Sequence, residues 1–426
     1  MQISQQQSLT FERTILRLWL PYMPGAVRAL SEDPRILFFV PDTGGTGVDG
    51  PLINAVNLAQ SFRDADYPAI FVYNGRREAF DRFIATGADV RRADFPIGSW
   101  KTHLNPFYRR KYSRKLARFI EDERIDVVYM FMRGTYLMSY MKGSEVLRVS
   151  EQLYASGELR PIRLFDNGFT FRPRAILSAW YRKYVRFNHD KSDLVVTMSN
   201  AQNLAATVKF GIPESKTVVV PPGVTRQAQH TECGLVRREL GIPTSTKVIL
   251  SVGRITPAKG VEEFGEIARL LAERGKSYRF LFAGYAIEPE YESEMQRRFG
   301  QYVTCHGHRS DIPNCLIDAD LYLHPSHREG GPLVIIEAME FGLPTVAWDI
   351  PGCDELITDG ENGSLVKFGD IDSAADEIER YLENQEIYDR ASNAAKQRFI
   401  DNHENADYSR RVIDNFNKAI AAKARR

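Results

Sequence analysis

Short apolar runs alternate with amphipathic stretches along the first half of the chain. The strongest run, RILFFV at Arg35–Val40, has no polar interruption, which is typical of a parallel strand covered on both faces. Further strands are expected at Ala69–Tyr73, Asp126–Met132, Ile162–Asp166 and Asp193–Ser199, with helical stretches between them. This alternation predicts an α/β domain with a doubly wound sheet.

The same pattern starts again in the second half. Strands are expected at Lys247–Arg254, Tyr278–Gly284, Tyr302–Gly307, Leu321–Ser326 and Pro344–Trp348. Because 426 residues are too many for one ordinary core, we expect two Rossmann-like domains, over residues 1–224 and 225–395. The last segment, 396–426, is expected to be helical and to cross back to the first domain.

Open parallel sheets bind ligands at the carboxyl ends of their strands, so two facing domains predict a cleft between them. Residues 1–30 form an extension before the first strand. Within it, Phe11, Ile15, Leu18 and Trp19 share a helical face. That face either lies on a membrane surface or packs against the first domain.

The net charge of +1 hides an asymmetry between the two halves. Residues 1–225 carry 31 Lys and Arg against 22 Asp and Glu, whereas the rest carry 25 against 33. The basic half is therefore the candidate for an anionic substrate or surface. Four cysteines without a C-x-x-C pair indicate a reducing compartment. With no apolar stretch near the ~20 residues that span a bilayer and no signal-peptide pattern, we expect a cytoplasmic protein, with peripheral contact at the inner membrane face left open.

A glycine loop follows the first strand as Gly45-x-Gly47-x-x-Gly50. A dinucleotide site also requires an acidic residue at the end of the second strand, but that strand ends in Tyr73-Asn74. The absence of an acidic residue at this strand end therefore argues against binding of NAD or FAD. The loop still suits a phosphate or a substrate hydroxyl that approaches the backbone.

Two cations, Arg254 and Lys259, lie in the loop after the strand at Lys247–Arg254. At the cleft-facing end of a strand, such a pair can neutralise a pyrophosphate without a metal ion. A solvated loop explains an isolated Arg-Lys pair as well, and only the neighbouring motifs favour the anion site.

The stretch HREGGPLVIIEAMEFG predicts a helix that starts with Pro332 at its first position and is capped by Gly342. Its first free amides, near Leu333 and Val334, form an anion site that the helix dipole strengthens. Gly331 leaves the backbone bare for close approach.

Two glutamates flank this turn. Glu337 lies on the apolar helix, where an unpaired carboxylate is costly and ribose hydroxyls are suitable partners. Glu329 precedes the helix and can meet the group beyond the phosphates. Alternatively, Glu329 only favours the helix N-terminus and Glu337 pairs with an arginine.

Several side chains that can bind zinc fall within 23 residues: Cys305, His306, His308, Cys315, His324 and His327. Their spacing matches no compact zinc pattern, so no metal site is expected. His308 and Arg309 are instead expected to begin a loop that lines the cleft, and the others to be wall residues.

Together these motifs resemble the retaining glycosyltransferases of family 4, which have the GT-B architecture of two facing Rossmann-like domains. Three segments follow one another in the family's order: SVGRITPAKG, the segment Cys305–Trp348 and PGCDELITDGENGSLV. Glu329 and Glu337 fill the family's E-x7-E pair. The likeness covers roughly residues 35–400 and is looser in the first half.

The resemblance implies sugar transfer from a nucleotide-diphosphate donor, UDP-sugar before GDP-sugar, with retention and without metal or cofactor. It implies a glycan or lipid-linked acceptor of cell-envelope polysaccharide or glycolipid synthesis, and no nucleic acid. The implied catalytic residues are Glu329, Arg254 and Lys259. The implied donor-binding residues are Glu337, Gly331, Pro332, Leu333, Val334, Gly307, His308, Arg309 and Gly253. The acceptor-side candidates are Gly44, Gly45, Asp42, His103, Arg133, Asp166 and Asn167.

The first half departs from the family's pattern. Met132-Arg133-Gly134 stands where many members have a histidine, Asp166-Asn167-Gly168 ends the next expected strand, and Pro222 replaces an asparagine. These changes lie on the acceptor side. They leave open a catalytically silent GT-B partner subunit and, on the same architecture, a sugar-nucleotide epimerase.

Overall fold

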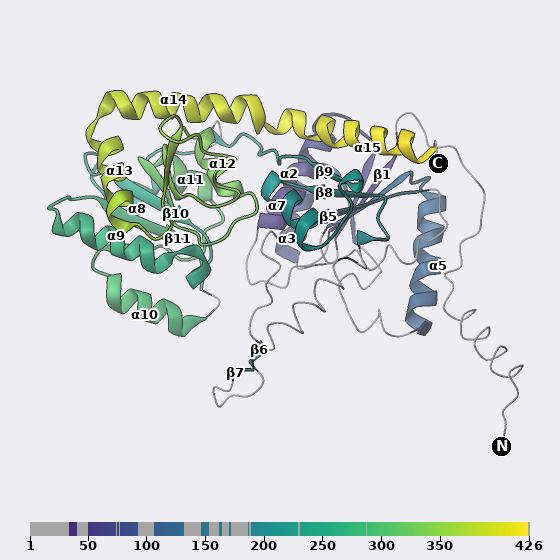
Figure 1. Cartoon of the computed structure of the whole chain (residues 1–426), viewed down its shortest axis with the longest axis horizontal. Coiled ribbons are helices and arrows are strands. Elements are labelled where there is room, and N and C mark those ends of the chain that lie inside the picture. The colour runs from purple at the N-terminus through teal and green to yellow at the C-terminus, as the bar shows by residue number, and fades with distance from the viewer. Residues whose placement is uncertain are drawn as a thin grey trace, which may run out of the picture.

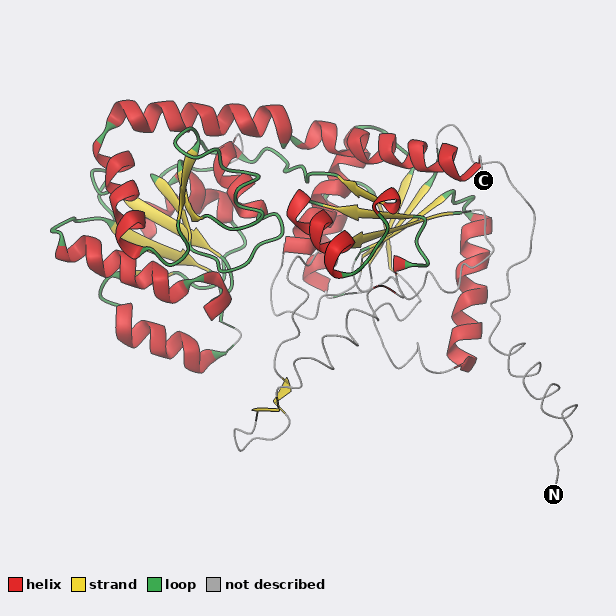
Figure 2. Ribbon diagram, viewed as in Figure 1, coloured by secondary structure: helices red, strands yellow, loops and turns green. Residues whose placement is uncertain are grey.

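The computed structural model contains two parallel sheets, each with helices packed on its faces (Figure 2). It describes residues 34–40, 50–73, 75, 77–92, 106–131, 146–152, 162–163, 170–171, 186, 189–228, 231–286 and 288–424. The two-domain α/β architecture expected from the hydrophobic pattern is confirmed in this part of the chain.

The first sheet has the order β3-β2-β1-β4-β5-β8-β9, and every pairing is parallel. All five residues of β1 are buried, because apolar clusters cover both faces of the sheet. Its strands are β1 (Ile36–Val40), β2 (Ala69–Tyr73), β3 (Asp89–Arg92), β4 (Val127–Met130), β5 (Leu147–Gln152), β8 (Leu194–Thr197) and β9 (Thr217–Val219). Its helices are α2 (Gly50–Asp64), α3 (Arg77–Ala85), α5 (Pro106–Asp122) and α7 (Asn200–Leu204).

The second sheet has the order β12-β11-β10-β13-β14-β15 and is also parallel. Strand order reverses between β10 and β13, where doubly wound sheets bind ligands. Its strands are β10 (Val248–Val252), β11 (Arg279–Ala283), β12 (Val303–Cys305), β13 (Leu321–His324), β14 (Thr345–Trp348) and β15 (Gly363–Val366). Its helices are α8 (Leu235–Glu239), α9 (Val261–Glu273), α10 (Pro289–Phe299), α11 (Ile312–Ile317), α12 (Leu333–Glu340), α13 (Ile371–Glu383) and α14 (Gln385–Asn402).

One predicted strand of the first sheet is wrong. Ile162–Arg163 (β6) pairs antiparallel with Thr170–Phe171 (β7) in a separate two-stranded sheet. The place beside β4 belongs to β5, whose sequence LRVSEQ lacks a continuous apolar run. Its polar residues are satisfied inside the domain: Ser150 Oγ lies 2.8 Å from His189 Nδ1, and Glu151 accepts a 2.6 Å hydrogen bond from Tyr129.

The chain passes between the domains twice, at neighbouring points. The segment after β9 leads into the second domain, and α14 continues through a short turn into α15 (Tyr408–Ala424), which lies along the first domain (Figure 1). The backbone of Val224 accepts from Asn405 N and donates to His403 O, so the two crossings are hydrogen-bonded to each other. Helix α15 places Val412 and Phe416 in the core of the first domain.

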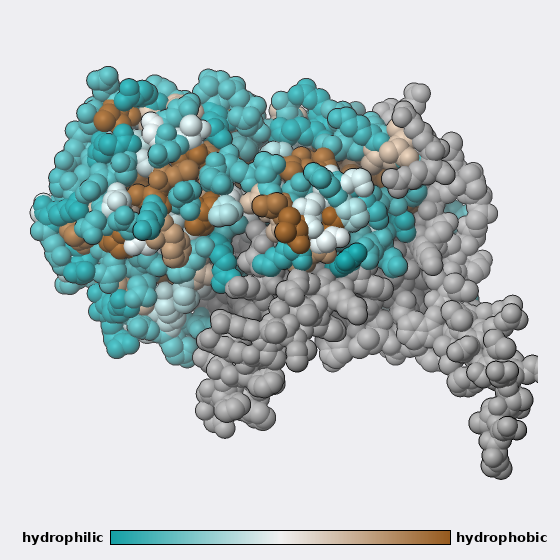
Figure 3. All heavy atoms as spheres, viewed as in Figure 1, coloured by the Kyte–Doolittle hydropathy of each residue, from teal (hydrophilic) through white to brown (hydrophobic). Residues whose placement is uncertain are grey.

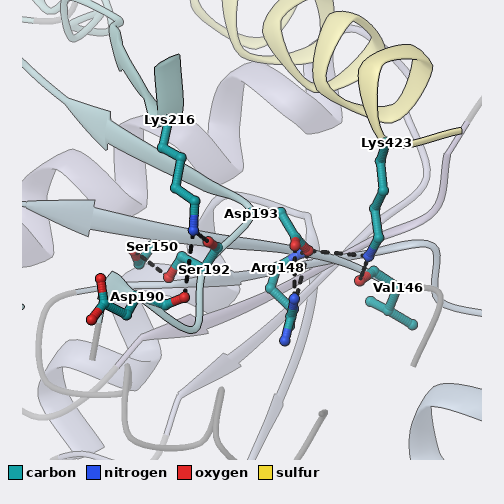
Figure 4. Close-up of polar contacts among 8 residues, drawn as sticks. All are labelled: Val146, Arg148, Ser150, Asp190, Ser192, Asp193, Lys216 and Lys423. Atoms are coloured by element: carbon teal, nitrogen blue, oxygen red, sulfur yellow. Dashed lines mark hydrogen bonds and ion pairs between the residues drawn. The ribbon is translucent and has the colours of Figure 1, made fainter. Parts of the chain in front are cut away.

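The end of α15 is fastened at the amino ends of β5 and β8 (Figure 4). Lys423 Nζ donates to Val146 O at 2.9 Å and lies 3.1 Å from Asp193 Oδ2. Arg148 also binds both oxygens of Asp193. Burial alone would raise the pKa of Asp193, but the Arg148 hydrogen bonds and the charges of Arg148 and Lys423 lower it.

The face shown in Figure 3 is mainly hydrophilic, and its hydrophobic side chains lie in separate groups. Large apolar side chains that are exposed include Leu204 and Val208, one turn apart beyond the start of α7. Within the described ranges, no helix combines the length and the apolar character that a bilayer crossing needs.

Candidate active site

The candidate site is built where the loops after β10 and β13 meet. These strands are neighbours in the sheet, so the residues that follow their carboxyl ends come together. Gly253 and Arg254 follow β10, whereas Glu329 follows β13. The Lys259 side chain lies over Gly253, since a Cβ placed on that glycine would be 3.6 Å from Lys259 Cδ.

Two side chains meet at one carboxylate oxygen of Glu329. Lys259 Nζ donates to Glu329 Oε1 at 2.6 Å, and His324 Nε2 lies 3.0 Å from the same oxygen. The other oxygen, Glu329 Oε2, accepts no hydrogen bond from any residue that the structure describes. The predicted catalytic pair Lys259 and Glu329 is therefore brought into direct contact.

The ionised form of Glu329 is favoured despite its burial. Burial alone would raise the pKa of this carboxyl. The charge of Lys259 and the hydrogen bond from His324 act in the opposite direction and hold the pKa of Glu329 well below its usual range. Lys259 and His324 thus favour the ionised form of this enclosed carboxylate.

Arg254 is the second predicted cation. Its side chain is half-buried, and it forms no ion pair or hydrogen bond with the residues placed by the structure. A half-buried guanidinium without a partner carries five donors that suit phosphate oxygens.

The loop before α12 brings its backbone close to the first domain. Gly331 has φ +140°, a conformation that side-chain-bearing residues rarely adopt. Ser199 Oγ donates to Gly330 O at 2.6 Å, which fastens this loop to the end of β8. Pro332 occupies the N-cap, one position earlier than predicted, and the helix begins at Leu333.

The start of α12 offers free backbone donors. The first N–H groups of a helix have no partner inside it, and here they belong to Leu333 and Val334. The partial positive charge of a helix N-terminus favours an anion at this point. At the other end, Gly342 has φ +70°, and its N–H donates to Met339 O, as expected for the predicted cap.

Glu337 lies on α12 and is half-buried. Burial, with a smaller contribution from the charge of Glu340, raises its pKa to about 7. No arginine pairs with Glu337 among the described residues, and no described group donates a hydrogen bond to it. Within this part of the chain the alternative of an ion-paired Glu337 therefore finds no support.

The third predicted part of the donor site lies after β12. His308 and Tyr285 approach edge to face, with ring centroids 5.7 Å apart. Gly307 O accepts from Gly284 N, which joins this loop to the end of β11. Arg309 is engaged elsewhere, because its guanidinium binds both oxygens of Asp311 and also Glu239.

The acceptor-side candidates lie outside the described residues, so their roles stay predictions. They are Asp42, Gly44, Gly45, His103, Arg133, Asp166 and Asn167. In the described ranges no group of three or more His, Cys, Asp or Glu side chains is arranged to hold a metal ion. His324 and His327, two members of the histidine cluster, instead contact Glu329 and Glu263.

Three contacts in and beside the site are not marked by any of the motifs: those of His324, Ser199 and Glu355. His324 contacts Glu329 and is more than the wall residue expected from the sequence; its position at a strand end, five residues before Glu329, is the signal that could have indicated this contact. Ser199 and Glu355 lie far along the chain from their partners, and no short motif marks them. Glu355 accepts hydrogen bonds from the N–H groups of Asn200 and Ala201, both at 2.7 Å, and so joins the second domain to the start of α7.

Two family models match the chain, one in each domain. Residues 53–227 match the model "Glycosyltransferase Family 4", and residues 235–398 match "Glycosyl transferases group 1". Together they cover most of both described sheets.

Curated relatives are similar over different shares of their length. An uncharacterized glycosyltransferase of Haemophilus influenzae is 29% identical over 85% of this chain and 94% of its own. The UDP-Gal:alpha-D-GlcNAc-diphosphoundecaprenol alpha-1,3-galactosyltransferase of Escherichia coli is 29% identical over 45% of this chain and 51% of its own. The alpha-D-kanosaminyltransferase of Streptomyces kanamyceticus is 37% identical over 35% of this chain, which spans only 40% of that relative.

Among solved structures, Anabaena HepE in complex with UDP and glucose superposes with a TM-score of 0.71. It is 19% identical, and the alignment covers 90% of this chain and all of HepE. At this identity the likeness concerns the fold, which is the GT-B arrangement of two Rossmann-like domains.

Proposed function

The chain belongs to glycosyltransferase family 4 and has the GT-B fold, and on this premise we propose that it moves a sugar from a nucleotide-diphosphate donor to a glycan or lipid-linked acceptor. UDP is favoured over GDP as the nucleotide. The UDP complex of HepE and the UDP-Gal donor named for the Escherichia coli relative support this choice.

The observation that carries the proposal is the Lys259–Glu329 contact of 2.6 Å at the carboxyl ends of β10 and β13. In this proposal Lys259 and Arg254 bind the diphosphate together with the amides at the start of α12. Glu329 contacts the donor sugar through its unengaged Oε2. Glu337 accepts hydrogen bonds from the ribose, and Tyr285 and His308 border the base.

The proposed chemistry retains the anomeric configuration and uses no divalent metal. Negative charge develops on the departing nucleotide during transfer, and fixed cations aimed at that charge lower the barrier. Arg254 and Lys259 fill this role. The departing phosphate accepts the acceptor's proton, so no protein carboxylate has to act as a nucleophile.

The proposed acceptor belongs to cell-envelope polysaccharide or glycolipid synthesis. The diphosphoundecaprenol-linked substrate named for the Escherichia coli relative supports a lipid-linked acceptor. The +9 charge of residues 1–225 suits an anionic acceptor, and it also suits peripheral contact with an anionic membrane from the cytoplasmic side.

A transfer assay tests the proposal directly. The protein is incubated with UDP-sugars or GDP-sugars and polyprenyl-diphosphate-linked glycans, and acceptor-dependent release of nucleotide is measured. Glu329→Ala and Lys259→Ala should each reduce transfer at least tenfold, because a lost charged contact costs about 1.5–3 kcal/mol. Lys276→Ala is the matched control, since Lys276 pairs with Glu383 and Glu379 away from the site.

The same assay separates the alternatives. Nucleotide binding without turnover on any acceptor would indicate a silent partner subunit. Inversion of the donor sugar without an acceptor would indicate an epimerase. Product NMR reports the anomeric configuration, and near-wild-type rates in both site variants would remove the assignment of Glu329 and Lys259.

A further inference from the structure

We propose that His324 is a positioning residue for Glu329, which it holds by a hydrogen bond from Nε2 so that Oε2 faces the donor sugar. The inference rests on the proposed function, which places Glu329 against that sugar. His324 is not among the catalytic or donor-binding residues that the family resemblance implies.

His324 is held rigidly at the end of β13. Its side chain is 2% exposed, and its ring stacks on that of Tyr322 with an interplanar angle of 30°. The Tyr322 hydroxyl lies 3.4 Å from His324 Nδ1 and 3.4 Å from Val252 N. An ionised carboxylate can only accept hydrogen bonds, so in the contact with Glu329 Oε1 the proton is carried by Nε2.

The two donors to Glu329 Oε1 differ in mobility. Lys259 ends a flexible four-carbon chain and is 25% exposed, whereas His324 is enclosed. An ammonium group has three N–H donors, so Lys259 can bind Glu329 and a phosphate oxygen together. His324 has one donor in this direction, and its 3.0 Å contact serves Glu329 alone.

Because His324 serves Glu329 alone, the orientation of the Glu329 carboxylate does not depend on whether a diphosphate is bound. If Lys259 shifts toward a phosphate, the His324 contact still determines the rotation of the Glu329 carboxylate. Oε1 then stays occupied, and Oε2 is the oxygen left for a sugar hydroxyl. A group held in place before reaction strengthens the contact that matters in the transition state.

Three substitutions of His324 distinguish positioning from simple packing. His324→Leu removes the hydrogen bond and keeps an apolar side chain. His324→Gln retains an N–H donor at a reach similar to that of Nε2. His324→Asn carries its amide closer to the backbone, near the place of Nδ1, and so provides polarity without the contact to Glu329.

Steady-state transfer kinetics with varied donor give the expected result. The Leu and Asn variants should lower kcat about tenfold, because a hydrogen bond to a charged group is lost, while the donor KM changes little. The Gln variant should recover most of kcat. The affinity for UDP alone, measured by calorimetry, should be unchanged in all three, because UDP lacks the transferred sugar that Glu329 contacts in the proposed function.

Glu329→Gln in the same assay separates the two hypotheses. If Glu329→Gln transfers as well as the wild type, the proposed function of the site fails, whatever His324 does. If Glu329→Gln is impaired but the Leu and Asn variants keep wild-type kcat, the positioning role of His324 is refuted. Equal loss in the Gln and Asn variants, or weaker UDP binding in both, would also refute it, and these polar variants decide the matter even if the Leu variant does not fold.

Discussion

The Lys259–Glu329 pair should be strongly coupled in a double-mutant cycle of stability. Its nitrogen and oxygen are 2.6 Å apart, and the side chains are only 25% and 10% exposed. At the effective dielectric constant of about 20 that suits protein sites, unit charges 4 Å apart attract by about 4 kcal/mol. Desolvation offsets much of this attraction, so a coupling energy of about 1–3 kcal/mol is expected.

The two single substitutions should differ. Lys259→Ala leaves an enclosed carboxylate with only His324 to compensate it, whereas Glu329→Ala leaves an ammonium that reaches solvent. Lys259→Ala should therefore lower the free energy of unfolding more than Glu329→Ala does. The double variant should be more stable than the sum of the two losses predicts, because no unpaired charge remains.

Urea unfolding of the four proteins measures this cycle, and an exposed pair provides the control. Arg269 and Glu273 also lie 2.6 Å apart, but their side chains are 44% and 53% exposed, so their coupling should be much smaller. A Lys259–Glu329 coupling no larger than that of the control pair would show that enclosure does not strengthen the contact. The electrostatic account of the site would then be refuted.

Three further predictions follow from the described contacts. Folding favours the protonated form of Glu337, whose pKa is raised from 4.5 to about 7, so its contribution to stability is full below pH 4.5 and is lost as the pH rises through 7. In urea unfolding, Glu337→Gln should therefore gain stability relative to wild type between pH 5 and 8, and a pH-independent difference would contradict this. Glu151, whose pKa is also raised to about 7, titrates in both proteins and does not affect their difference. Gly223→Ala should lower the melting temperature, because its Cβ would lie 2.7 Å from Tyr408 Cβ. Gly50→Ala should not, because its Cβ would have no described atom within 4 Å; equal melting temperatures would count against the tight crossing. Transfer should be unchanged by EDTA, and a loss restored by magnesium would overturn the metal-independent mechanism.

Much of the fold could be predicted because its strands are continuous apolar runs. β1 and β10 were placed within one or two residues, since a strand buried on both faces has little choice of composition. β5 and β3 were not predicted, because their sequences, LRVSEQ and DVRR, are polar and contain no continuous apolar run. In β5 that polarity is satisfied by tertiary partners such as Tyr129 and His189, which a local pattern cannot reveal.

The residues of the candidate site also fall into two groups, those that short motifs predict and those that only the tertiary structure brings together. Arg254, Lys259, Glu329 and the start of α12 are readable because each belongs to a short motif at a strand or helix end. The rest depends on contacts between distant residues. Ser199 and Gly330 are 131 positions apart, and which oxygen of Glu329 is free depends on side-chain geometry alone.

The return of α15 to the first domain has a consequence for biosynthesis. Val412 and Phe416 complete an apolar cluster whose other members lie mainly between residues 36 and 220. During translation this cluster lacks its α15 residues until the whole second domain has been made. The core of the first domain is thus completed only after the second domain has been synthesised. Chaperones that shield apolar surface should be needed most during that interval.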